Sequence, residues 1–162
     1  MSRPDKAACA GFTLIELLVV IAILGIVASI AIPQFNSFTR NATLKAASRE
    51  LYAQFQRAKM EAIKRNETVA IVFSTVGQNK YSIFTDLDGD RSLDGDEISL
   101  GETSLPQGLL LENISFPNAA TSFTAKGRPG GDFGGVDLKD SASGRAIRLT
   151  TTLAGYVHLA DR

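Results

Sequence analysis

An apolar run near the N-terminus constrains this chain more than any other feature. The run from Phe12 to Ile32 is 21 residues long, and its only polar side chains are those of Thr13, Glu16 and Ser29. A helix of that length is roughly 30 Å long, which matches the hydrocarbon thickness of a bilayer. The sequence therefore predicts a membrane segment close to the start of the chain.

Three interpretations of this segment compete. A secretory signal peptide has a shorter apolar region followed by a small-x-small cleavage site, and "PQFNSF" after Ile32 does not supply one. The other two are a plain membrane anchor and a segment that first spans lipid and later packs against copies of itself. Glu16 favours the last, because a carboxylate in hydrocarbon costs about 2.5–3.5 kcal/mol and a plain anchor gains nothing from it. The alternative is that Glu16 lies at the headgroup level and is simply solvated.

The stretch "GFTLIE" at residues 11–16 resembles the cleavage and methylation signature of type IV prepilins and type II secretion pseudopilins. The similarity continues to Pro33, where that family kinks its helix. The resemblance implies that a prepilin peptidase cuts between Gly11 and Phe12 and methylates the new Phe12 amine. It also implies that Glu16 pairs with the Phe12 amine of a neighbouring subunit. Such a pairing fits the physics, because a buried carboxylate needs a cationic partner and the pair would set the axial register between subunits.

The pattern and the resemblance divide the chain into four parts. These are a prepilin leader at 1–11, a transmembrane and assembly helix at 12–33, an amphipathic helix half at 34–66 and an antiparallel β domain at 67–162. The family implies a single-pass protein of the bacterial inner membrane, with a cytoplasmic N-terminus and a periplasmic C-terminal domain. The basic residues on both sides of the span leave this orientation open.

The second half of the helix has one apolar face. Apolar residues recur at steps of three and four, as on one side of a helix: Leu44, Ala47, Leu51, Phe55, Ala58 and Ala62. Asn66 is the predicted C-terminal stop, with the cations Lys64 and Arg65 in the last turn. A continuous helix from Phe12 to Arg65 would be on the order of 80 Å long.

Short segments of β character follow the helix. They are expected at 68–74, 80–86, 97–102, 108–116, 121–127, 145–152 and 155–160. A helix followed by antiparallel strands predicts an α+β fold, with a long pilin-type helix packed on an antiparallel β-sheet domain. This order resembles the minor pseudopilin H group, also called GspH/FimT-like. The glycine-rich stretch "GRPGGDFGG" (127–135) lacks the Lys-Ser/Thr of a phosphate loop and is interpreted as a flexible surface loop.

An acidic stretch, "DLDGDRSLDGDE" at 86–97, is a candidate Ca²⁺ site. Six of its residues occupy positions 1, 3, 5, 7, 9 and 12 of an EF-hand-type loop: Asp86, Asp88, Asp90, Ser92, Asp94 and Glu97. Position 6 should be glycine for the sharp turn, but it is Arg91, and strands rather than helices flank the loop. The EF-hand fold is therefore rejected, while a Ca²⁺ site on a β-turn loop is retained. The alternative is a solvated Asp/Gly connection without a metal.

Composition weighs against other functions. The formal net charge is zero, so no general basic field indicates nucleic acid. Some FimT-like relatives bind DNA through a Gly-Arg-x-Arg hairpin, whereas this chain has "GYVH" at 155–158, with Arg145 and Arg148 nearby as the residues for that alternative. No nucleophile, base and orienter constellation indicates an enzyme.

The resemblance therefore implies a minor pseudopilin, a structural subunit of the periplasmic pseudopilus of a type II protein secretion system, which prepilin peptidase would process. The expected partners are prepilin peptidase, other pseudopilins, the inner membrane and the secretion assembly platform, with DNA disfavoured. No cofactor is required, and Ca²⁺ is the one candidate. The alternative is a minor type IV pilin that acts in pilus assembly or DNA uptake, which neighbouring genes would distinguish.

Overall fold

The computed structural model of the chain describes residues 12–74, 79–131 and 133–162. The predicted leader 1–11, with Gly11, lies outside these residues, as does most of the turn expected after residue 74. The described residues divide into two compact units, one that ends at Thr39 and one that spans Arg40–Arg162. The helix α1, Leu14–Arg65, is continuous through Pro33 and contributes to both units.

The end of α1 agrees with the prediction for Asn66. This residue adopts φ 58°, the left-handed conformation that Asn tolerates after the last helical turn. The Asn66 N–H donates to the Ile63 carbonyl (3.3 Å), and the Glu67 N–H donates to the Ala62 carbonyl (3.2 Å). These two bonds form a Schellman motif, which satisfies carbonyls that the helix leaves unpaired.

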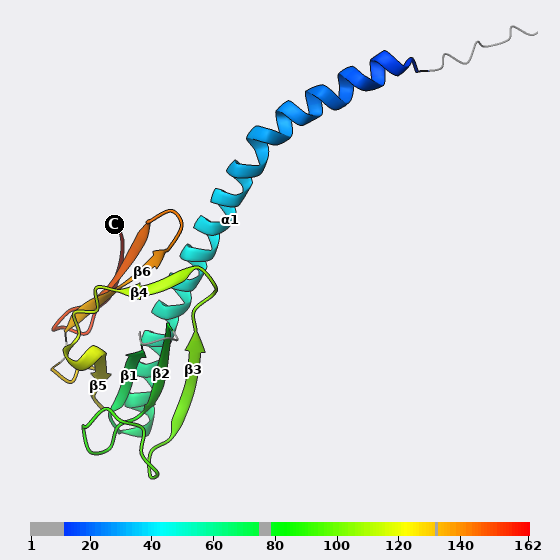
Figure 1. Ribbon diagram of the computed structural model, residues 1–162. Coiled ribbons are helices and arrows are strands. Elements are labelled where there is room, and N and C mark those ends of the chain that lie inside the picture. The colour runs from blue at the N-terminus through cyan, green and yellow to red at the C-terminus, as the bar shows by residue number, and fades with distance from the viewer. Residues whose placement is uncertain (1–11, 75–78, 132) are drawn as a thin grey trace, which may run out of the picture. The chain divides into compact units, whose positions relative to one another are not determined.

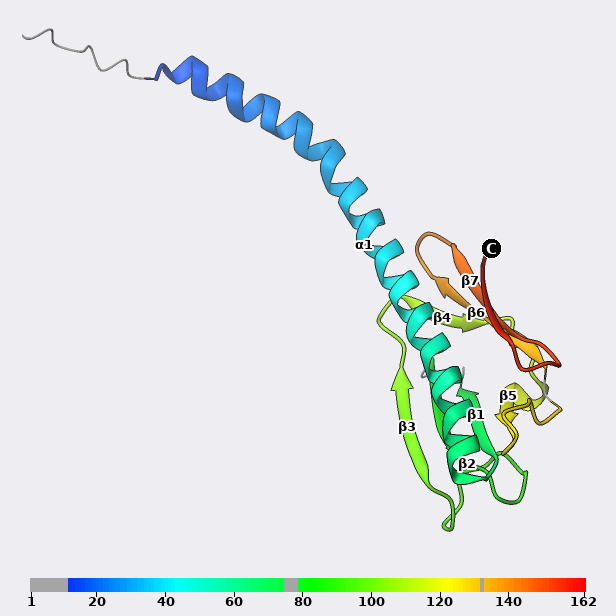
Figure 2. The ribbon, with the colours of Figure 1, turned by 180° about the vertical axis from the view of Figure 1, so that it is seen from behind.

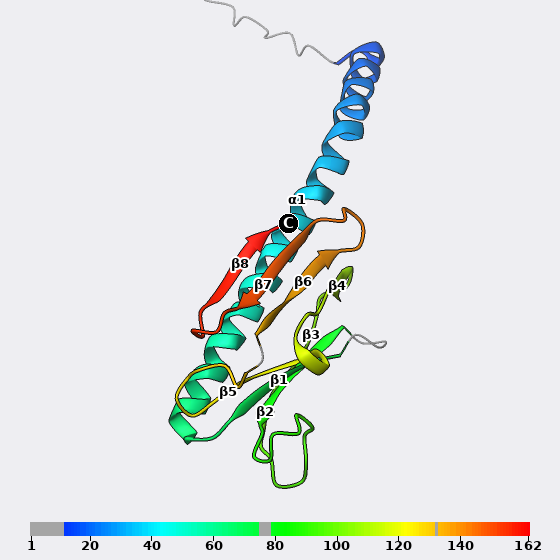
Figure 3. The ribbon, with the colours of Figure 1, turned by 90° about the vertical axis from the view of Figure 1, so that its left-hand side faces the viewer.

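The second unit contains two antiparallel four-stranded sheets, in the orders β3-β2-β1-β5 and β4-β6-β7-β8. The strands are β1 (Val69–Ser74), β2 (Lys80–Thr85), β3 (Ser99–Ser104), β4 (Leu109–Glu112), β5 (Ala120–Phe123), β6 (Gly134–Asp140), β7 (Ala146–Thr151) and β8 (Val157–Asp161), with a short 3₁₀ turn, η1 (Pro117–Ala119), before β5. The α+β prediction is confirmed. In Figure 1 the first sheet lies beside the C-terminal part of α1, and in Figure 3 the strands β6, β7 and β8 of the second sheet run next to one another.

One hydrophobic core joins α1 to both sheets. All six predicted apolar-face positions of α1 are buried, and Ser48 is buried with them. Phe55 lies at the centre, with its ring centroid 6.2 Å from Phe73 of β1, 6.2 Å from Phe116 and 6.1 Å from Phe123 of β5. Figure 2, the view from behind, shows this part of α1 crossing β1 and β2. Every residue of the core lies between Leu44 and Val157, within the second unit.

The interpretation of residues 127–135 as a flexible loop is wrong at its C-terminal end. Gly134 and Gly135 begin β6, which is the strand between β4 and β7. A Cβ on Gly134 would lie 2.8 Å from the Ser115 carbonyl oxygen, and one on Gly135 would lie 2.7 Å from the Leu149 carbonyl oxygen. These glycines therefore serve close backbone packing rather than mobility.

Several predicted strands are shorter or shifted in the structure. The segment expected at 121–127 ends as a strand at Phe123, and the segment expected at 108–116 ends at Glu112. The strand expected to begin at Glu97 begins at Ser99. The last hairpin, β7 with β8, is confirmed, with its turn at Thr152–Tyr156 and Gly155 at φ 79°.

Candidate functional site

The first unit presents an apolar surface without any internal cover. Its large apolar side chains are exposed throughout, from Phe12 at 82% to Phe38 at 69%. From Leu14 on they belong to α1, the one described helix whose length and composition suffice to cross a membrane, and none of its most apolar stretch is buried. Water does not solvate such a surface favourably, so the structure requires lipid or other subunits around it.

Glu16 has a structural role at the start of α1 that the sequence analysis missed. Its N–H donates to Thr13 Oγ1 (3.3 Å), and the Thr13 hydroxyl lies 3.5 Å from Glu16 Oε2. Threonine followed three residues later by glutamate is the sequence pattern of a capping box, readable in "TLIE", and the bond from the Glu16 N–H to the Thr13 hydroxyl is the first of the two bonds of that motif. The capping role and the predicted pairing with a neighbouring Phe12 amine are compatible, because the exposed carboxylate has a second oxygen.

The acidic loop brings its carboxylates together in two groups. Oxygens of Asp86, Asp88 and Glu97 lie within 4.8 Å of one another, and so do oxygens of Asp88, Asp90 and Asp94. Asp88 belongs to both groups. Asp86 is 3% exposed, while the others are half-buried or exposed. The structure therefore gathers all five predicted acidic ligands, and carboxylate oxygens are the ligands that Ca²⁺ prefers.

Backbone amides of the loop hold these carboxylates in place. Glu97 accepts from the N–H of Leu87 (2.8 Å) and of Asp94 (3.2 Å), which closes the loop between its first and last turns. Asp86 Oδ1 accepts from the N–H of Gly89 (2.9 Å). Arg91 adopts φ 64°, so position 6 has the turn geometry that glycine would normally supply. The concern that Arg91 prevents the sharp turn is thus removed.

The loop's charges repel one another. The charge of Asp90, then burial, then the charges of Asp88 and Glu97 raise the pKa of Asp94 above its usual value. A divalent cation would relieve this repulsion. The Ca²⁺ site stays a prediction, because charged turns also occur without metal.

Calcium is expected to raise the melting temperature of the chain at millimolar concentration, because it would bind the folded loop and not the unfolded one. Asp88→Asn should abolish the rise, since Asp88 belongs to both carboxylate groups. Asp96→Asn is the matched control, because Asp96 lies in the same loop but in neither group. Calorimetry on wild type and both variants measures the binding directly, and an absence of heat and of any melting shift in the wild type would dismiss the site.

The two arginines of the DNA alternative both have partners within the fold. Arg148 Nη1 donates to Asp137 Oδ1 (2.9 Å) and its Nη2 to Ser115 Oγ (3.1 Å). Arg145 Nη1 donates to Asn41 Oδ1 (3.1 Å). The charge of Arg148 is therefore offset by a buried carboxylate, which weakens its attraction for phosphate.

Asp137 is the centre of a buried ionic cluster on β6. Its carboxylate is 2% exposed and also accepts from Asn113 Nδ2 (2.8 Å) and from Arg162 Nη1 (2.8 Å). Burial acts to raise the pKa of Asp137, but the hydrogen bonds from Asn113 and Arg162 and the charge of Arg148 outweigh it, so the pKa lies below its usual value. The cluster fastens the last residue of the chain to the second sheet.

Asp137→Asn is expected to lower the free energy of unfolding by about 2 kcal/mol at pH 7, because it removes charge-assisted hydrogen bonds. A depressed pKa stabilises the fold above the ordinary carboxyl pKa of about 4, and this stabilisation is lost as the pH falls through the folded-state value. Urea unfolding of wild type and variant should therefore converge toward pH 2–3. Glu112→Gln is the control, because its pair with Lys139 is about one-third exposed and should change stability by less than about 1 kcal/mol.

Comparison with known proteins identifies the family. Residues 47–155 match the family described as type II transport protein GspH, and residues 6–32 match the prokaryotic N-terminal methylation motif. The first match alone covers more than half of the chain. The chain belongs to the GspH family. This family is a structural, pilin-type family and not a family of enzymes.

Curated relatives of this GspH-family chain are pilin-like. Pilin-like protein PilA1 of Thermus thermophilus is 38% identical over 98 residues, which are 60% of this chain and 61% of that protein. A fimbrial protein of Pseudomonas aeruginosa is 40% identical over 83 residues, 49% of this chain and 53% of that protein. The chain thus spans only 53–61% of the length of these relatives. A probable minor fimbrial protein of Dichelobacter nodosus is 31% identical over 122 residues, 71% of this chain and 66% of that protein.

Two solved structures share the fold. The minor pseudopilin EpsH from the type 2 secretion system of Vibrio cholerae superposes with a TM-score of 0.53 at 14% identity, covering 73% of this chain and 96% of that one. The type IV minor pilin FimU of Pseudomonas aeruginosa superposes with a TM-score of 0.60 at 21% identity, covering 76% of this chain and 92% of that one. The methylation motif and the exposed apolar helix indicate that the GspH-family chain is anchored in a membrane by its N-terminal segment and carries a C-terminal globular domain.

Proposed function

We propose that this GspH-family chain is a minor pseudopilin of a type II secretion system, stored in the inner membrane and extracted into a short periplasmic filament. The observation that carries the proposal is the combination of a GspH match over residues 47–155 with a methylation motif over residues 6–32. The N-terminus would lie in the cytoplasm and the globular domain in the periplasm. The assembly platform of the secretion system and other pseudopilins would be its partners.

Processing would begin at the boundary between Gly11 and Phe12. A prepilin peptidase would cut this bond and methylate the new amine of Phe12. Phe12 is 82% exposed and α1 begins only at Leu14, so Phe12 does not have to be unwound from the helix. Gly11 itself lies outside the described residues.

Assembly would then bury the apolar surface of the first unit against other subunits. The Glu16 carboxylate, the only acidic group on α1 before Arg40, would lose its solvation in such a bundle. Pairing with the Phe12 amine of a neighbour would offset that cost and fix one axial register. Pro33, which lies inside α1, lacks one helical hydrogen bond and would let the helix adapt to its neighbours.

The second candidate is a minor pilin of a type IV pilus. One observation favours it specifically: curated relatives are named as fimbrial or minor fimbrial proteins. Both candidates require the same processing and the same helix bundle. They differ in the machine that the filament serves.

Mass spectrometry of the mature chain, purified from membranes of its own bacterium, tests the shared part of the proposal. We expect an N-terminus at Phe12 with one methyl group on its amine, and an N-terminus at Ser2 or after Ile32 would refute it. Deletion of the gene distinguishes the two candidate functions. Loss of exoprotein secretion with intact surface pili supports the pseudopilin, while loss of pili with intact secretion supports the pilin.

A further inference from the structure

Three of the four sheet edges in the second unit are protected against further strands. The β3 edge has a register shift opposite Ile83 and Phe84, and Arg57 Nη2 donates to its Leu100 carbonyl (3.3 Å). The β4 edge is four residues long, and its Leu111 N–H donates to the Asn79 side chain (3.2 Å). Bulges, short strands and side-chain caps are the usual protection of natural sheet edges.

The β5 edge is protected by a loop. Pro129 forms a bridge with Phe123, and the Gly130 N–H donates to the Ser122 carbonyl (2.9 Å). The segment after β5 therefore covers the side of the strand that faces away from β1. Only the β8 edge has no comparable cover among the described residues.

The β8 edge is regular and open. Its five residues pair with β7 in unbroken register. The Thr152 N–H donates to the Tyr156 carbonyl and the Arg162 N–H donates to the Ala146 carbonyl, both at 3.0 Å. The backbone groups of Tyr156 and Arg162 therefore face toward β7. By the alternation of antiparallel strands, the backbone groups of Val157, Leu159 and Asp161 face outward. No hydrogen bond from another described residue reaches them.

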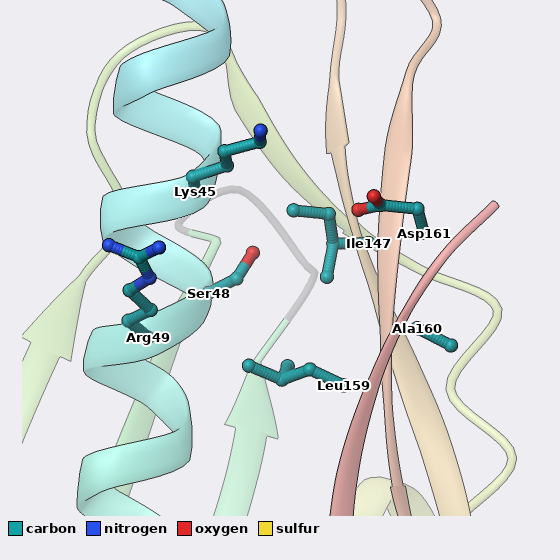
Figure 4. Close-up of a pocket in the computed structure, with 7 residues that line it drawn as sticks. All are labelled: Lys45, Ser48, Arg49, Ile147, Leu159, Ala160 and Asp161. Atoms are coloured by element: carbon teal, nitrogen blue, oxygen red, sulfur yellow. The ribbon is translucent and has the colours of Figure 1, made fainter.

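A groove lies beside this edge, between α1 and the hairpin of β7 and β8. Its volume is about 290 Å³. Figure 4 shows the residues that line it: Lys45, Ser48, Arg49, Ile147, Leu159, Ala160 and Asp161. In Figure 3, β8 runs alongside α1, so a strand added to β8 would follow the helix past these side chains.

The groove has an excess of positive charge. Lys45 and Arg49 make no ion pair with any described residue, although both are exposed, and Asp161 is the one acidic residue of the lining. The two cations are one helical turn apart, about 6 Å along α1. Alternate residues of a strand are about 6.8 Å apart, a similar spacing.

We propose that β8 is the docking edge for an extended acidic segment of a second protein. The segment would pair with the outward backbone groups of β8 and extend the second sheet. Its acidic side chains, at alternate positions, would face Lys45, which extends toward the hairpin in Figure 4, and Arg49, whose guanidinium points away from the hairpin in Figure 4 and would turn toward the segment. The positions between them would face away from the helix. The backbone pairing supplies affinity and the charges supply selectivity.

A synthetic peptide of alternating glutamate and valine, roughly six residues long as in a typical strand, tests the proposal on the full-length chain in detergent micelles. Leu159→Pro should weaken its binding about tenfold or more, because the lost N–H faces outward and the ring blocks pairing. Leu159→Ala is the matched control: it trims the same side chain, keeps the N–H and should bind nearly as the wild type does.

A charge exchange on α1 tests whether Lys45 and Arg49 select an acidic segment. This test does not depend on how well the Leu159→Pro variant folds. The Lys45→Glu/Arg49→Glu double variant should lose the glutamate peptide and bind a lysine–valine peptide, which the wild type should reject. The proposal is overturned if the wild type binds neither peptide at millimolar concentration, or if it binds both equally. It is also overturned if Leu159→Pro binds the glutamate peptide as tightly as Leu159→Ala does. The same holds if single-stranded DNA displaces the peptide equally from these two variants, because binding would then need only the cations.

Discussion

Glu16→Gln is expected to leave the chain inserted in the membrane but to reduce its incorporation into filaments more than a hundredfold. Leaving one buried charge without its partner costs about 3–5 kcal/mol, and 1.4 kcal/mol corresponds to a factor of ten. Glutamine can still act as the third residue of the capping box with Thr13, so this variant removes the charge and keeps the cap. Quantitative immunoblots of sheared filaments and of membranes measure the ratio.

Thr13→Ala is the matched control for this prediction. It removes the capping hydroxyl and keeps the Glu16 carboxylate, so it should cost only about 1 kcal/mol of local helix stability and permit assembly. If Glu16→Gln assembles as the wild type does, the carboxylate serves the capping box or lies solvated at the headgroups. The register role would then be wrong, while the processing of Phe12 would be unaffected.

Phe55→Ala is expected to lower the free energy of unfolding of the globular domain by about 3–5 kcal/mol. Phe55 is fully buried, and its ring contacts aromatic side chains on β1, on β5 and before η1. Its removal leaves a cavity at the point where the helix meets the sheets, and the surrounding rings cannot all close it. Urea unfolding of residues 40–162 measures the change, because the whole core lies inside this segment.

Met60→Ala provides the comparison on the same helix. Met60 is 64% exposed, so its truncation should change the stability by less than about 0.5 kcal/mol. A loss below about 1 kcal/mol for Phe55→Ala would show that the helix is not an essential part of the core. Such a result would also contradict the α+β packing described above.

The sequence predicted the helix well because its signals are local. The apolar face from Leu44 to Ala62 repeats with the period of a helix, and all of its predicted positions are buried. Asn66 ends the helix through its own backbone conformation. Turn chemistry likewise located the last hairpin around Gly155, because glycine tolerates the required φ of 79°.

The sequence did not predict β6 because its signals are not local. Apolar and polar residues alternate only over the four residues from Val136 to Lys139, and Asp137 is buried although it is one of the polar residues of that alternation. Two glycines and two aspartates also give this segment the composition of a loop. The reasons for these residues lie elsewhere in the chain: the backbones of Ser115 and Leu149 leave no room for a Cβ, and distant arginines pair with Asp137.

The open β8 edge and its groove, like β6, depend on residues that are distant in the sequence. Lys45 and Leu159 are far apart in the sequence and line one groove only because α1 packs beside the second sheet. The sequence by itself determined the membrane segment, its processing signature and the helix, since each depends on neighbouring residues along the chain. The tertiary structure alone decided which strand lies inside a sheet, which edge stays open and which charges are paired, because these depend on contacts between residues distant in sequence.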